Sequence, residues 1–90
     1  LGDEISASAG AVTDAALREF VRGHASTLYH PTSTCRMGID DFAVVDPTLK
    51  VHGIEGLYVA DASVFPSMVS GNTNAPTVMV AERAAQFIQG

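Results

Sequence analysis

The stretch FAVVDPTLKVHGIEGLYVAD, residues 42–61, restricts the possible folds more than any other part of the chain. Its apolar runs are short for helices, and turn-forming residues separate them, namely Asp46 with Pro47 and the segment from Gly53 to Gly56. The pattern predicts strand, turn, strand, turn, strand, and the closing LYVAD is typical of a buried strand. We therefore expect several short strands here, although the chain is too short for a doubly wound sheet.

Apolar periodicity predicts one helix on each side of this stretch. The first covers about residues 13–23 and begins at Thr13, a good N-cap residue. The second begins at about Pro76, with Asn74 or Ala75 at its cap, because proline is pre-organised for the first helical turn. The apolar face of this second helix comprises Val80, Ala81, Ala84, Phe87 and Ile88.

His30 ends the short, β-capable sequence STLYH, and Pro31 keeps it out of the α region. We expect a strand that places His30 at its end, followed by a loop. Histidine is the usual side chain for accepting a proton near neutral pH. A single histidine between a strand and a loop is also often structural, so these residues alone leave both interpretations open.

A metal site has little support in the residue pattern. The possible ligands are His24, His30, Cys35 and His52, but their spacings match no common zinc pattern and no C-x-x-C pair is present. Cys35 is more typical of a small buried apolar residue than of a nucleophile. No G-x-S-x-G elbow supports a serine hydrolase. We expect no metal ion.

The loop GNTNAP, residues 71–76, is a candidate ligand-binding segment. Its small residues let the backbone approach a ligand, and free N–H groups at the following helix N-terminus stabilise negative charge. An Asn-capped helix start explains the same residues without a ligand. Asp61 has two similar interpretations, as a turn residue or as a group that binds a ribose-type hydroxyl at the carboxyl end of a strand.

Composition argues against several functional classes. The net charge is −5 and the five basic residues are scattered, so there is no footprint for nucleic acid or an anionic membrane. No apolar run approaches the roughly 20 residues of a membrane span. The opening LGDEISASAG lacks the regions of a signal peptide, and no G-x-G-x-x-G loop completes a nucleotide site. Nothing in the chain indicates a cellular compartment.

Three blocks, YHPTSTCRMG, VVDPTLKVHGIEGLYVADASVFP and SGNTNAPTVMVAERAA, together resemble the C-terminal end of the glucose–methanol–choline (GMC) oxidoreductases. These are FAD-dependent alcohol oxidases and dehydrogenases. The resemblance covers about residues 13–90 and implies the last portion of a two-domain FAD-binding fold, α/β as a whole and α+β in isolation, with two helices and several short strands. It places residues 1–41 in the substrate-binding domain and residues 42–90 in the FAD-binding domain.

The same resemblance implies roles for individual residues. His30 matches the catalytic base, which takes the substrate hydroxyl proton while hydride passes to flavin N5. Asn72 matches the second catalytic position, which stabilises the alkoxide. Different members have His or Asn at this position, and the Asn found here is similar to the choline-dehydrogenase and hydroxymethylfurfural-oxidase branch. The implied cofactor-binding residues are Asp61 and Ala62 at the ribityl–phosphate region of FAD, and Thr73, Asn74 and Ala75 at the flavin pyrimidine edge.

Ser33 departs from the family pattern, since many members have glycine at this position. We expect a backbone that needs no positive φ there, and a loop of slightly different shape. The implied partners are a small alcohol and the missing N-terminal FAD-binding part, without which residues 1–90 should bind FAD weakly or not at all. Two alternatives stay open: a non-redox flavoprotein similar to hydroxynitrile lyases, and a non-catalytic segment that complements an FAD-binding partner chain.

Overall fold

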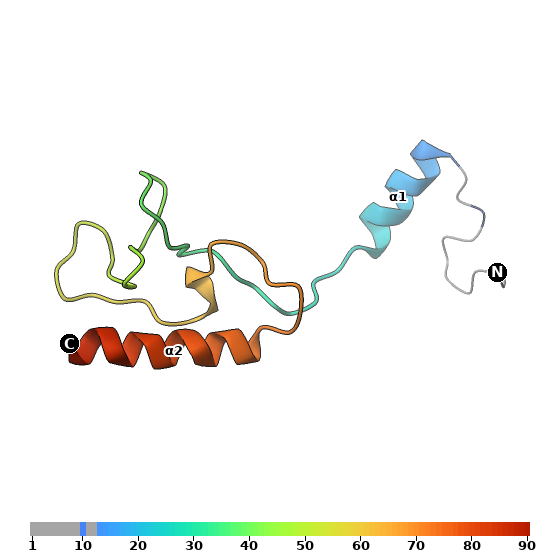
Figure 1. Cartoon of the computed structure of the whole chain (residues 1–90). Helices are drawn as coiled ribbons and strands as arrows, with labels where there is room; N and C mark the ends of the chain where they lie inside the picture. The colour runs from blue at the N-terminus through green and yellow to red at the C-terminus, as the bar shows by residue number, and fades with distance from the viewer. Residues whose placement is uncertain (1–9, 11–12) are drawn as a thin grey trace.

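A computed structural model of the chain describes residue 10 and residues 13–90. Expectations for residues 1–9, 11 and 12, including the missing signal peptide, lie outside the described part. The elements are α1 (Asp14–His24), the short 3-10 helix η1 (Ala62–Val64) and α2 (Asn74–Gln89). Figure 1 shows α2 running along the preceding loops, while α1 stands apart at the end of an extended connection.

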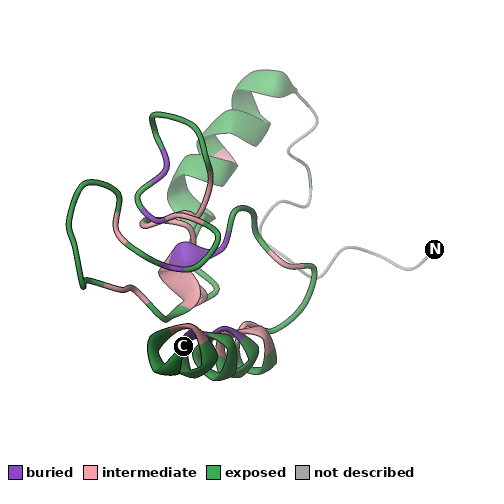
Figure 2. Ribbon diagram, turned by 60° about the vertical axis from the view of Figure 1, so that its left-hand side comes forward, coloured by how far each residue is buried: buried purple, intermediate pink, exposed green. Residues whose placement is uncertain are grey.

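Helix α1 lies where the sequence predicts it. Thr13 is its N-cap, and its Oγ1 accepts a hydrogen bond of 3.2 Å from the N–H of Ala16. The helix continues through Gly23 and ends at His24, one residue beyond the expected end. None of its residues is buried, as Figure 2 shows, and α1 contacts neither of the other helices described. Local capping therefore accounts for α1 without help from tertiary packing.

The strands expected over residues 42–61 are not present; the described residues form isolated backbone bridges there. Tight turns are the physical reason. Asp46 Oδ1 accepts hydrogen bonds from the N–H groups of Thr48 and Lys50 at 2.7 and 3.2 Å, and Leu49 has a φ of 69°. The backbone changes direction before a ladder can extend. The bridges pair Met37 with Val45, Val45 with Val51, and Lys50 with Tyr58.

The expected strand carrying His30 is also not formed in the described residues. Tyr29 has a φ of 62°, which interrupts extended backbone directly before His30. The Tyr29 N–H instead donates to Thr27 Oγ1 at 3.0 Å and closes a local turn. Of the expected α/β fold, the described residues therefore contain the helices but not the strands.

The buried core lies between α2 and the loops above it, as Figure 2 shows. From the apolar face predicted for α2, Val80 and Ala84 are buried, whereas Ile88 is 58 % exposed. Helix η1 packs against α2 and contributes a fully buried residue, Val64. The core consists of Val45, Leu49, Val64, Phe65, Val80 and Ala84.

Residues 33–37 run beside η1 and are bonded to it through the backbone. The N–H groups of alternate residues in this segment donate to successive carbonyls of η1. The pairs are Ser33 to Ala62 at 3.3 Å, Cys35 to Ser63 at 2.8 Å, and Met37 to Val64 at 2.9 Å. This register holds the loop that follows His30 against the core.

Many large apolar side chains of the described residues are exposed to solvent. The radius of gyration is 19.4 Å, against about 12 Å for a compact domain of this length. Leu28, Tyr29, Ile39 and Phe42 are each at least 80 % exposed. Large apolar groups of this kind usually mark surfaces that another part of a protein covers. Neither α1 nor α2 has the length and apolar character of a membrane-spanning helix, so the described residues contain none.

Candidate active site

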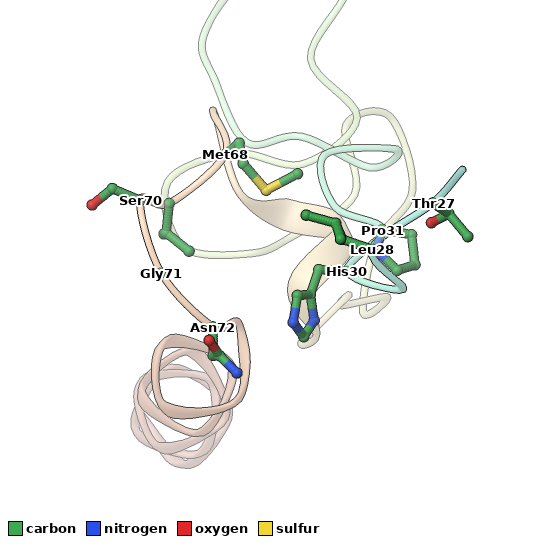
Figure 3. Close-up of a pocket in the computed structure, with 9 residues that line it drawn as sticks. Thr27, Leu28, His30, Pro31, Met68, Ser70, Gly71 and Asn72 are labelled. Atoms are coloured by element: carbon green, nitrogen blue, oxygen red, sulfur yellow. The ribbon is translucent and has the colours of Figure 1, made fainter. Parts of the chain in front are cut away.

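A pocket of about 690 Å³ opens between the turn around His30 and the loop before α2 (Figure 3). His30 and Asn72, far apart in the sequence, both line it. Figure 3 shows the imidazole and the carboxamide on opposite sides of the same opening, with Met68 and Leu28 forming an apolar wall. The complete lining is Thr27, Leu28, His30, Pro31, Met68, Val69, Ser70, Gly71 and Asn72.

His30 is held at one edge of this pocket. The turn at Tyr29 and the ring of Pro31 restrict its backbone from both sides. Its half-buried side chain is hydrogen-bonded through Nδ1 to the hydroxyl Oγ1 of Thr73, at 3.1 Å. A histidine bonded at Nδ1 has Nε2 as its remaining nitrogen for proton transfer. Nδ1 of His30 is therefore engaged with Thr73, which orients the ring, and Nε2 is left for proton transfer.

The start of α2 lies beside Asn72 and has no side-chain cap. The N-cap residue is Thr73, and the expected cap at Asn74 or Ala75 is wrong, since both lie within the helix. The Thr73 hydroxyl accepts no bond from the first turn. Such a cap is worth about 1 kcal/mol. Pro76 has no N–H, and the N–H groups of Asn74 and Ala75 belong to the first turn, which lacks intrahelical acceptors. These two groups and the helix dipole favour a negatively charged or electron-rich group at this end.

Asp61 is the N-cap of η1, which confirms that it is a turn residue. Its Oδ1 accepts hydrogen bonds from the hydroxyl of Ser63 and, at 2.8 Å, from the N–H of Ser63. These bonds, the hydroxyl first, lower the pKa of the Asp61 carboxyl below its usual value. Ala62 next to it is half-buried, and its carbonyl accepts the bond from Ser33. A role of both residues in binding a cofactor stays a prediction.

Comparisons with known proteins bear on the whole chain. A family model described as GMC oxidoreductase matches residues 2–81. The chain belongs to the GMC oxidoreductase family. The expected family is thereby confirmed, and the three sequence blocks that indicate it all begin within the matched range.

Two relatives show how much of a GMC oxidoreductase this chain represents. An oxygen-dependent choline dehydrogenase of Escherichia coli O45:K1 (strain S88 / ExPEC) is 52% identical over 89 residues, which are 99% of this chain and 16% of that protein. A protein of the same name from Acinetobacter baumannii (strain AYE) is 53% identical over the same shares. The chain thus spans 16% of the length of the curated relatives it matches.

The expectation that Ser33 needs no positive φ is wrong. Its φ is 69°, in the left-handed region that glycine adopts without strain. The bond from its N–H to the Ala62 carbonyl and the packing of the following residues hold this conformation. The GMC loop is therefore built in its glycine-type shape although serine occupies the position.

Sequence reasoning did not single out three residues near the site. Arg36 and Asp40 form a salt bridge next to the loop, and their opposite charges at an i, i+4 spacing were the available signal. Met68 in the pocket wall accepts a hydrogen bond of 3.7 Å through its sulfur from the Thr32 hydroxyl. Within residues 10 and 13–90, no three His, Cys, Asp or Glu side chains cluster closely enough to hold a metal ion.

Proposed function

We propose that this GMC oxidoreductase chain is the C-terminal catalytic segment of an FAD-dependent enzyme that oxidises the CH–OH group of a small alcohol. The observation that carries the proposal is the convergence of His30 and Asn72 on one pocket. One side chain accepts protons near neutral pH and the other donates hydrogen bonds without carrying charge. Choline, named in the relatives, is the first alcohol to test.

The residues around the pocket fit a flavin cofactor. The uncapped N–H groups at the start of α2 suit the electron-rich edge of a flavin ring. Thr73, Asn74 and Ala75 would hold that edge, and Asp61 with Ala62 would hold the ribityl–phosphate part. FAD, when bound, supplies the hydride acceptor. The protein supplies position and electrostatics.

His30 acts on the substrate hydroxyl. Its neutral ring accepts the hydroxyl proton at Nε2, and the electron pair left on the substrate oxygen makes the adjacent C–H a better hydride donor. Asn72 donates a hydrogen bond to this oxygen as its negative charge develops, which favours the transition state over the ground state. Met68 and Leu28 line the pocket beside these two groups and offer an apolar contact to the carbon chain of the alcohol.

The open surfaces support a segment that works within a larger protein. A radius of gyration of 19.4 Å and the isolated position of α1 are unlike an independent domain. We assign residues 1–41 to the substrate-binding domain and residues 42–90 to the FAD-binding domain. Because the chain spans 16% of the length of its relatives, we expect an N-terminal part to supply the rest of the FAD site. The 90 residues alone should bind FAD weakly or not at all.

The test is anaerobic flavin reduction by choline and other small alcohols in the full-length, FAD-loaded enzyme. His30→Gln should slow reduction by roughly 10²–10⁴-fold, the usual contribution of a general base, while FAD content is unchanged. His52→Gln is the matched control, because His52 is exposed, bonds to the Gly38 carbonyl at 3.0 Å and lies outside the pocket. Near-normal reduction in His30→Gln would remove His30 from the role of base. Cleavage of a cyanohydrin without flavin bleaching by any alcohol would instead indicate a lyase.

A further inference from the structure

We infer that Thr73 is a positioning residue for His30. Its hydroxyl oxygen accepts a hydrogen bond from Nδ1–H, and this keeps Nε2 unprotonated for the substrate. The inference rests on the proposed role of His30 as the base. It concerns the Thr73 side chain, whereas the family resemblance implies only that the Thr73 backbone lies near the flavin.

Two threonines at the same helix position behave differently in this molecule. Thr13, the N-cap of α1, accepts the N–H of Ala16 at 3.2 Å. Thr73, the N-cap of α2, makes no such cap, and its Oγ1 lies 3.1 Å from His30 Nδ1. Thr73 has a helical backbone, with φ −88° and ψ −8°, in place of the extended backbone of Thr13. The Thr73 hydroxyl is therefore hydrogen-bonded to His30 and not to the first turn of α2.

Thr77 holds the backbone of Thr73 in place. The carbonyl of Thr73 accepts both the N–H of Thr77 at 3.1 Å and its hydroxyl at 2.6 Å. These two bonds hold the backbone of Thr73 at the start of α2. His30 and Thr73 are both half-buried, which limits competition from water for the bond between them.

A neutral imidazole carries one proton, and the partner of one nitrogen decides which nitrogen holds it. When Thr73 Oγ1 accepts from Nδ1–H, the lone pair lies on Nε2. On proton transfer the substrate O–H bond breaks, its electron pair stays on the substrate oxygen, and an Nε2–H bond forms. The Nδ1–H stays in place and continues to donate to Thr73, so the ring keeps its orientation through the step.

Kinetics of the full-length, FAD-loaded enzyme test this role. Thr73→Val keeps the shape and removes the hydroxyl, and it should lower the limiting rate of anaerobic flavin reduction by up to roughly 10²-fold, the cost of a misplaced reacting group. The alcohol concentration for half-saturation should change little. Thr73→Ser should restore the rate to within a few-fold of wild type. The control is Thr48→Val, since the Thr48 hydroxyl bonds to Asp46 away from the pocket.

A second readout does not depend on turnover. ¹⁵N NMR of the histidine ring nitrogens, with the His30 signals identified by their loss in His30→Gln, reports the tautomer in substrate-free enzyme. We expect a protonated Nδ1 in wild type and Thr73→Ser, and a shift toward protonated Nε2 in Thr73→Val. An unprotonated Nδ1 in wild type, or full activity in Thr73→Val, would overturn the inference. Full activity in His30→Gln would defeat the proposed function, while the NMR result would still decide the contact.

Discussion

Arg36 and Asp40 are joined by a bidentate ion pair, in which the guanidinium donates to both carboxylate oxygens at 2.9 and 2.6 Å. Asp40 also accepts the N–H of Phe42 at 3.1 Å. The pair closes the turn that follows the His30 loop and passes directly over Gly38. It therefore connects the loop that carries the proposed base to the segment that builds the core.

The stability of the protein should fall in acid because of this pair. The hydrogen bond from Arg36, and next the Phe42 N–H, lower the pKa of Asp40 from 3.8 to about 2. A folded pKa below the unfolded one adds stability above pH 3.8, which is lost as the pH falls toward about 2. Denaturant unfolding at several pH values should show a smaller acid loss in Asp40→Asn than in wild type. Asp41→Asn, which keeps the pair, should retain the wild-type loss; equal losses in all three proteins would contradict this prediction.

Gly38→Ala should destabilise the protein by about 1–3 kcal/mol through overpacking. A Cβ at Gly38 would lie 3.0 Å from Arg36 Nη1, 3.0 Å from Asp40 Oδ2 and 3.1 Å from Ala43 Cβ. Gly23→Ala is the control, because nothing lies within 4 Å of its added Cβ and its φ is not positive. That change should stabilise α1 by roughly 0.5–1 kcal/mol. The free energy of unfolding from denaturant titration should fall in Gly38→Ala but not in Gly23→Ala, in which the helix content measured by circular dichroism should rise or stay unchanged.

Ser33→Gly should be more stable than Ser33→Ala by about 1 kcal/mol. Both changes remove the bond from the Ser33 hydroxyl to Thr32 Oγ1, so their difference isolates the strain at φ 69°. Thermal unfolding of the two variants measures it. A Ser33→Ala protein as stable as Ser33→Gly would show that the backbone leaves the left-handed region at this position.

Asn72→Ala should slow flavin reduction by roughly 10²–10³-fold, as the loss of one donor to a developing oxyanion usually does. Asn72→Asp should be slower still, because a carboxylate of nearly the same shape repels the charge on the substrate oxygen. The limiting anaerobic rate and the alcohol affinity separate this effect from weaker binding. A rate in Asn72→Asp close to wild type would rule out hydrogen-bond donation by Asn72.

The residue pattern was sufficient to predict those elements that depend on neighbouring residues alone. The Thr13 cap and the apolar spacing predict α1 to within a residue, and Val80 with Ala84 identify the buried side of α2. The three sequence blocks around His30, Asp61 and Asn72 also indicate the GMC family, which the comparisons confirm. Strand formation was not predictable in this way, since a ladder needs a second strand in register, and the turns at Asp46 and Leu49 separate the possible partners.

The residue pattern predicts α1, most of α2 and the GMC family, and through the family resemblance it points to His30 and Asn72. Only the tertiary structure shows how these side chains are arranged. The backbone bonds between residues 33–37 and η1 hold the His30 loop so that His30 and Asn72 share one pocket. The same packing turns the Thr73 hydroxyl from its helix toward the imidazole. The hydroxyl of a threonine before a helix can bond either to the first turn of that helix or to another side chain. At Thr73 it bonds to His30, which is distant in the sequence and lies close only in the folded chain.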